Sequence, residues 1–98
     1  MPTAVLLRTS HSHLYPGSIV TLDHEAPRTA RSHPAVIEFA DGSGATATLS
    51  RVGDHALELA VDEYVTQKRH AIATHRWLLR PIDAACTRWR ITRRLPAT

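Results

Sequence analysis

The sequence predicts a small, mostly all-β fold: an antiparallel β-meander of about five to six strands, barrel-like or curled so that its edges are hidden. Two observations predict it. Apolar runs of strand length recur about every ten residues between Pro34 and Pro81, with turn-forming residues between them. Within these runs apolar and polar residues alternate, which is typical of strands with one buried face.

Four such runs fill the meander core, which we place at residues 34–81. They lie at residues 35–39, 45–50, 56–61 and 72–79. The turn at 41–44 holds two glycines that tolerate the positive φ of a tight hairpin. The third run also suits a helix, because Ala, Leu and Glu are good helix formers. The alternation of Leu57, Leu59 and Val61 nevertheless favours a strand.

The N-terminal part, residues 1–33, is expected to add two strands and an exposed loop. The strands lie at 4–8 and 18–23, and Pro16-Gly17 between them is a turn signal. The polar stretch at 25–34 contains two prolines and has no periodicity, so we expect it to cross the surface as a loop.

The basic C-terminal segment, residues 82–98, fits two structures. Ile82, Cys86 and Trp89 fall at helical spacing, with Asp83 as a possible cap, whereas Trp89, Ile91 and Arg93 fall at strand spacing. We predict one helical turn near Asp83 followed by an extended segment.

Length and composition indicate a single domain, residues 1–98, with an ordinary globular balance of 43% hydrophobic and 21% charged residues. The one cysteine, Cys86, excludes an internal disulfide and a cysteine-rich zinc site. This cysteine usage fits a reducing compartment. No apolar stretch approaches the roughly 20 residues of a membrane helix. We therefore expect a cytoplasmic protein with no membrane partner.

Positive charge next to aromatic rings is the best functional signal. The net charge is +3, and residues 88–94 place four arginines and one tryptophan within seven positions. Lys68 and Arg69 form a second basic cluster, and Arg76 and Arg80 flank Trp77. Nucleic-acid binding needs cations for phosphates and flat rings for bases, and arginine with tryptophan supplies both.

We therefore predict a non-catalytic binding module whose basic surface most favours nucleic acid. The predicted contacts are Lys68, Arg69, Arg76, Arg88, Trp89, Arg90, Arg93 and Arg94. In this hypothesis the arginines neutralise phosphates, and Trp89 stacks on a base or anchors the tail. The alternative is a solvated tail in which Trp89 fills the barrel and the arginines keep the protein soluble.

A second hypothesis makes the chain an interaction module of a bacterial-type cytoplasmic protein, binding a protein partner or a second copy of itself. Trp89, Ile91 and Leu95 would then dock on the other chain, or a sheet edge would pair with it. Tryptophan and arginine are also enriched at protein interfaces, so composition does not separate the two hypotheses.

The histidines give a weaker signal for metal binding. His11 and His13 form an H-x-H pair, which on a strand would turn both rings to one metal ion. The alternative is a polar loop with exposed rings, and no metal or other cofactor is predicted. A lone histidine on an inner strand face, as expected for His75, is more often a hydrogen-bonded core residue.

Motifs for catalysis are missing from the sequence. No serine lies in a G-x-S-x-G context, and the glycine-rich turn at 41–44 lacks the lysine of a phosphate-binding loop. An enzyme or small metal-binding protein is therefore the third hypothesis, behind the two binding functions.

Overall fold

The computed structural model describes residues 4–23, 31–64, 71–85 and 87–96, without the side chains of 63–64 and 71–73. These residues form seven strands and no helix. The strands are β1 (Val5–Thr9), β2 (Ile19–Leu22), β3 (His33–Glu38), β4 (Gly44–Gly53), β5 (Ala56–Tyr64), β6 (Ala71–Pro81) and β7 (Arg88–Leu95). The predicted mostly-β, barrel-like fold is confirmed, and the C-terminal segment supplies one strand more than the expected five to six.

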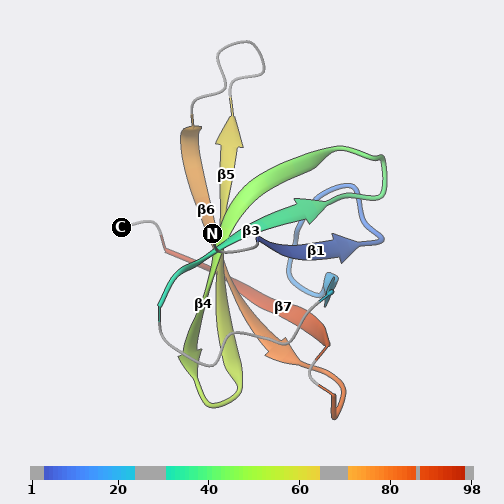
Figure 1. Ribbon diagram of the computed structural model, residues 1–98, viewed down its shortest axis with the longest axis vertical. Helices are drawn as coiled ribbons and strands as arrows, with labels where there is room; N and C mark the ends of the chain where they lie inside the picture. The colour runs from blue at the N-terminus through green and yellow to red at the C-terminus, as the bar shows by residue number, and fades with distance from the viewer. Residues whose placement is uncertain (1–3, 24–30, 65–70, 86, 97–98) are drawn as a thin grey trace.

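The strands close into a barrel in the order β1-β2-β7-β6-β5-β4-β3 (Figure 1). Strands β3 to β6 form the predicted antiparallel meander, and β7 continues it. The β1–β2 hairpin fills the gap between β3 and β7. β2 pairs antiparallel with β7, whereas β1 pairs parallel with β3. An odd number of strands cannot alternate in direction all the way around a closed barrel, so one parallel pair is unavoidable.

The core fills the barrel from every strand, as the alternation predicts. Leu49, Leu57, Leu59 and Leu79 have no exposed surface, and Trp77 is 9% exposed. The remaining core residues are Val5, Leu7, Val20, Leu22, Ala35, Ile37, Ala47, Val61, Trp89 and Ile91. At about 25 cal/mol per Å² of apolar surface removed from water, this shared interior is the main force that holds the seven strands together.

The hairpin between β3 and β4 has the tight turn that its glycines predict. Gly42 has a φ of 88° and donates its N–H to the carbonyl of Phe39 at 3.0 Å. The Asp41 carboxylate accepts hydrogen bonds from the Ser43 hydroxyl and backbone N–H, at 2.6 and 2.9 Å. These bonds from Ser43, the hydroxyl first, stabilise the charged form and lower the pKa of Asp41.

The prediction of a helical turn near Asp83 is wrong, because this residue lies in the turn between β6 and β7. A helix N-cap accepts from the residues two and three positions ahead. The Asp83 carboxylate instead accepts from the backbone N–H groups of Thr87 and Arg88, at 3.0 and 3.4 Å. It therefore closes a hairpin turn, and the alternating burial of Trp89 and Ile91 continues the chain as a strand.

The β5–β6 hairpin continues beyond the rest of the barrel (Figure 1). Pairing of β4 with β5 begins at Val61, and pairing of β6 with β7 begins at Arg76. Residues 62–64 therefore pair across the hairpin with residues 71–74 and with no other described strand. The described part of the chain contains no helix with the length and apolarity needed to cross a bilayer.

Candidate nucleic-acid interface

Four exposed arginines lie on the outer surface of β6 and β7, and we call them together the arginine face: Arg80, Arg88, Arg90 and Arg93. On β7, Trp89 and Ile91 point into the barrel, so the intervening positions face outward. On β6, the same alternation around Leu79 turns Arg80 outward. All four arginines are exposed.

A β-bulge places Arg93 on this surface. Strict alternation from Trp89 and Ile91 would turn Arg93 into the barrel. The register shifts between Leu78 and Leu79, so that Leu79 pairs with Ile91 but Leu78 pairs with Arg93, and Thr92 is the extra residue. An extra residue in one strand exchanges the inward and outward positions of the side chains that follow it. Arg93 therefore points outward.

The same bulge turns Arg94 to the inner side, where it faces Trp77 across the ladder. Its guanidinium donates to Nδ1 of His75 at 2.6 Å. Since a guanidinium has donors only, Nδ1 of His75 is the acceptor in this contact. Arg94 is therefore tied to the barrel opening and is not part of the arginine face.

The central feature of the arginine face is that Arg80 and Arg90 are direct cross-strand partners. Side chains in this position have Cβ atoms about 4.5–5.5 Å apart, and like charges there are destabilising. Neither guanidinium, nor that of Arg93, forms an ion pair with a described residue. The fold thus holds uncompensated positive charge at adjacent positions of two strands.

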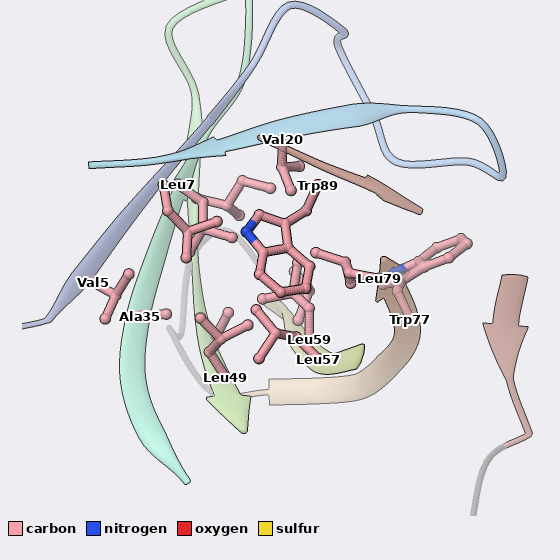
Figure 2. Packing of buried hydrophobic residues seen from close by; sticks show 14 of the residues in the cluster. Val5, Leu7, Val20, Ala35, Leu49, Leu57, Leu59, Trp77, Leu79 and Trp89 are labelled. Atoms are coloured by element: carbon pink, nitrogen blue, oxygen red, sulfur yellow. The ribbon is translucent and has the colours of Figure 1, made fainter. Parts of the chain in front are cut away.

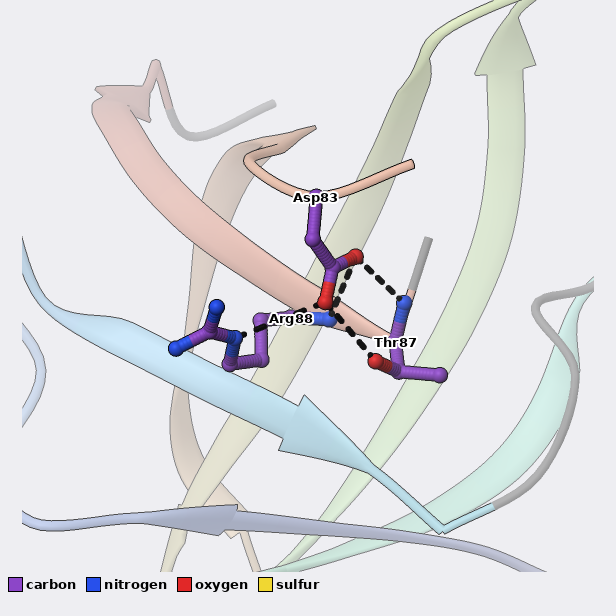
Figure 3. Close-up of polar contacts among 3 residues, drawn as sticks. All are labelled: Asp83, Thr87 and Arg88. Atoms are coloured by element: carbon purple, nitrogen blue, oxygen red, sulfur yellow. Dashed lines mark hydrogen bonds and ion pairs between the residues drawn. The ribbon is translucent and has the colours of Figure 1, made fainter. Parts of the chain in front are cut away.

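The other outward arginines of this region are partly compensated. Arg88 Nε lies 3.4 Å from Asp83 Oδ2 (Figure 3). Arg76 Nε donates to Glu58 Oε1 at 2.5 Å, and this hydrogen bond, followed by the attraction of the two charges, raises the pKa of Arg76. Positive charge is therefore concentrated at the Arg80–Arg90 pair rather than spread evenly over β6 and β7.

Hydrogen bonds also hold Asp83 in its charged form. Partial burial raises its pKa, but the hydrogen bonds from Thr87, through hydroxyl and backbone, and then those from Arg88 outweigh burial, so the net shift is downward. The Thr87 hydroxyl donates to Oδ2 at 3.0 Å. Asp83 is consequently a fixed negative charge at one border of the arginine face.

Trp89, expected to stack on a base or to anchor the tail, is 1% exposed. Figure 2 shows its indole inside the barrel, among Leu7, Leu57 and Leu79. A base could not stack on this ring without opening the core, so Trp89 anchors β7 from within. Trp77 is also buried, so neither tryptophan presents an aromatic ring at the arginine face.

Two of the predicted contacts, Lys68 and Arg69, lie outside the described residues. The structure brings together Arg88, Arg90 and Arg93. It pairs Arg76, on the same outer surface, with Glu58 and turns Arg94 to the inner side. Sequence analysis did not include Arg80 among the contacts. Alternation from Trp77 would have placed it outward, but only the strand register reveals that it faces Arg90.

His11 and His13 lie in the loop between β1 and β2, so strand alternation does not turn both rings to one side. Nδ1 of His11 is 2.8 Å from the hydroxyl of Tyr15. The Tyr15 ring also lies 5.2 Å, centroid to centroid, from that of His13. Within the described residues, no group of three or more histidine, cysteine, aspartate or glutamate side chains could hold a metal ion.

No known protein family, curated protein or solved structure matches the chain. The chemistry available at the arginine face is recognition of anions: planar guanidinium groups pair bidentately with phosphate or carboxylate oxygens. Arginines at successive outward positions of a strand, such as Arg88 and Arg90, stand about 6.6 Å apart along it, which favours an anion with repeated charges.

Proposed function

We propose that the chain is a non-catalytic binding protein that holds nucleic acid through phosphates on its arginine face. The observation that supports this proposal is the direct opposition of Arg80 and Arg90, neither of which forms an ion pair with a described residue. Opposed like charges cost stability in the free protein, and phosphates bound to the two guanidinium groups would remove that repulsion. A polyanion can contact Arg80 and Arg90 and, at the same time, Arg88 and Arg93.

The proposal predicts a steep salt dependence. Each phosphate neutralised on a single strand lowers the slope of log affinity against log salt by about 0.7, and on duplex DNA by about 0.9. Contacts from Arg80, Arg90 and Arg93 alone therefore predict a slope near −2 on single strands. Fluorescence anisotropy of a labelled oligonucleotide, titrated between about 50 and 200 mM salt, measures it.

The Arg80→Gln/Arg90→Gln double variant should lower the affinity at low salt about tenfold and reduce the slope by about 1.4 on single strands. The matched control is Arg31→Gln with Arg8→Gln, which removes the same charge from exposed positions outside β6 and β7. Equal losses in both double variants would mean that net charge, and not the arginine face, attracts the oligonucleotide. Absence of binding by the parent protein at low salt would end the proposal.

A second candidate function, pairing with a protein partner or a second copy of the chain, is favoured by one observation. Among the described strands, residues 63–64 and 71–74 pair only across the β5–β6 hairpin, so an added strand would pair with their outer backbone edges. Sedimentation over a range of protein concentrations tests self-association. A mass that stays at 10.9 kDa would remove the second-copy form of this candidate.

A further inference from the structure

A cluster of aromatic rings lies in the loop between β1 and β2, which is hydrogen-bonded to the strand that carries Arg90 and Arg93. We call His11, His13 and Tyr15 the ring cluster. The Tyr15 ring is 39% exposed and packs edge-on against His11, with centroids 5.1 Å apart and planes at 72°. Among the described phenylalanine, tyrosine and tryptophan side chains, Tyr15 is the exposed one.

The backbone under Tyr15 is held rigidly. Residues 15–18 form a turn in which Ser18 donates its N–H to the Tyr15 carbonyl at 3.0 Å. Pro16 and Gly17, with φ of 99° at Gly17, occupy the two central positions as a type II turn requires. The buried Ser18 hydroxyl accepts the Tyr15 N–H at 3.1 Å. An exposed ring on a fixed backbone loses little conformational entropy when a ligand binds.

This turn is bonded directly to β7 within the arginine face. Gly17 donates its N–H to the Ile91 carbonyl at 2.7 Å, and Ile91 donates to the Ser18 carbonyl at 2.9 Å. Ile91 lies between Arg90 and Arg93 in the strand. Tyr15 is two residues from Gly17, so its Cα lies within about 7 Å of that contact point.

Resting on the proposed function, we infer that the ligand is single-stranded nucleic acid, with a base stacked on the Tyr15 ring while neighbouring phosphates contact Arg90 and Arg93. Bases in a duplex are already stacked on one another, so their faces are not open to a side chain. Unpaired bases expose their faces, and stacking on a protein ring tolerates any base. A basic track beside an exposed ring therefore favours a single strand.

The acidic residue of the β3–β4 turn, which lies beside this loop, is engaged in hydrogen bonds within its own turn. His11 accepts the N–H of Ala40 at 3.0 Å, which places the loop beside the β3–β4 turn. Asp41 follows Ala40, but its Oδ1 accepts both hydrogen bonds of Ser43. On the β7 side of the loop, the charged residues that flank the bonded Ile91 are Arg90 and Arg93, and neither forms an ion pair with a described residue.

The test measures anisotropy with three labelled probes of equal length, about 12 nucleotides: oligo-dT, an abasic strand with the same phosphates, and a duplex. The parent protein should bind oligo-dT at least about fivefold more tightly than the abasic strand. Tyr15→Leu should remove this difference and leave the salt slope unchanged, whereas Tyr15→Phe should keep it because the ring face remains. Oligo-U in place of oligo-dT distinguishes RNA from DNA.

Equal affinity of the parent for oligo-dT and the abasic strand, or no effect of Tyr15→Leu, would overturn this inference. The proposed function would survive that result if binding still depended on salt and on Arg80 and Arg90. An affinity loss of about tenfold in Arg80→Gln/Arg90→Gln, with the preference for oligo-dT over the abasic strand retained at low salt, would support both. Unfolding midpoints of the Tyr15 variants should match that of the parent, since the ring is exposed.

Discussion

Alternate residues of β6 and β7 form an inner and an outer surface, and different interactions determine the stability of each. Inside, Trp77, Leu79, Trp89 and Ile91 join one apolar core in which each neighbour is favourable. Outside, the neighbour on the adjoining strand decides whether a charge is stabilised: Arg76 forms an ion pair with Glu58 of β5, whereas Arg80 lies directly opposite Arg90. The comparison teaches that folding stability is supplied by the inner surface, while the outer surface retains unneutralised charge that is available to a ligand.

The largest expected effect comes from removing the indole inside the barrel. Trp89→Ala should lower the free energy of unfolding by about 3–5 kcal/mol, because it deletes a large buried side chain and leaves a cavity. Its outward neighbour provides the control: Arg90→Ala should change stability by less than about 0.5 kcal/mol. Urea unfolding followed by far-UV circular dichroism measures both. Similar losses of unfolding free energy in the two variants would contradict the claim that the inner surface supplies most of the stability.

The inner surface could be predicted from the sequence because burial depends on residue type at every second position. Leu57, Leu59 and Val61 are buried on the side that their alternation indicates. The outer surface could not be predicted to the same extent, because its energetics depend on which residues face each other across strands. The turn length around Asp83 sets the pairing of Arg80 with Arg90, and no local pattern encodes it.

The bulge at Thr92 and the base-stacking candidate show the same limit. Alternation alone assigns Arg93 to the same side as Ile91, and one extra residue reverses that assignment. Tyr15 precedes a turn signal that the sequence does reveal, but its closeness to β7 arises from a bond between Gly17 and Ile91, which are far apart in the chain. Contacts between distant segments, rather than local patterns, assemble the proposed site.

The second prediction reverses one charge of the opposed pair. Arg80→Glu should replace repulsion from Arg90 by a cross-strand ion pair and raise the unfolding temperature by about 2–5 °C. The same change should lower affinity for an oligonucleotide at least about tenfold at low salt. Differential scanning fluorimetry and anisotropy measure the two quantities. A variant that is both less stable and still able to bind would show that the pair is neither repulsive nor part of the interface.

The third prediction concerns the border of the arginine face. Asp83→Asn removes the negative charge beside Arg88 but keeps an oxygen that can accept the Thr87 N–H. Affinity for an oligonucleotide should increase about twofold at low salt, and the increase should vanish at high salt as screening removes the field of Asp83. Anisotropy at the two salt concentrations measures it. A decrease in affinity would mean that Asp83 positions Arg88 for binding and does not compete with the phosphate.

The smallest expected effect is a pH dependence of stability from the same residue. The folded pKa of Asp83 is lowered from its ordinary value of 3.8, so its contribution to stability is fully present above that value and is lost as the pH falls through the folded pKa. Compared with the parent, Asp83→Asn should have a lower urea midpoint at neutral pH, and the two midpoints should converge below pH 3.8. Asp41, whose pKa is also lowered, titrates in both proteins and does not affect the difference. A difference between the two urea midpoints that stays constant down to low pH would mean that Asp83→Asn destabilises the protein through changed turn geometry and not through the lost charge. Electrostatic interactions would then contribute less to the stability of the outer surface than the strand register indicates.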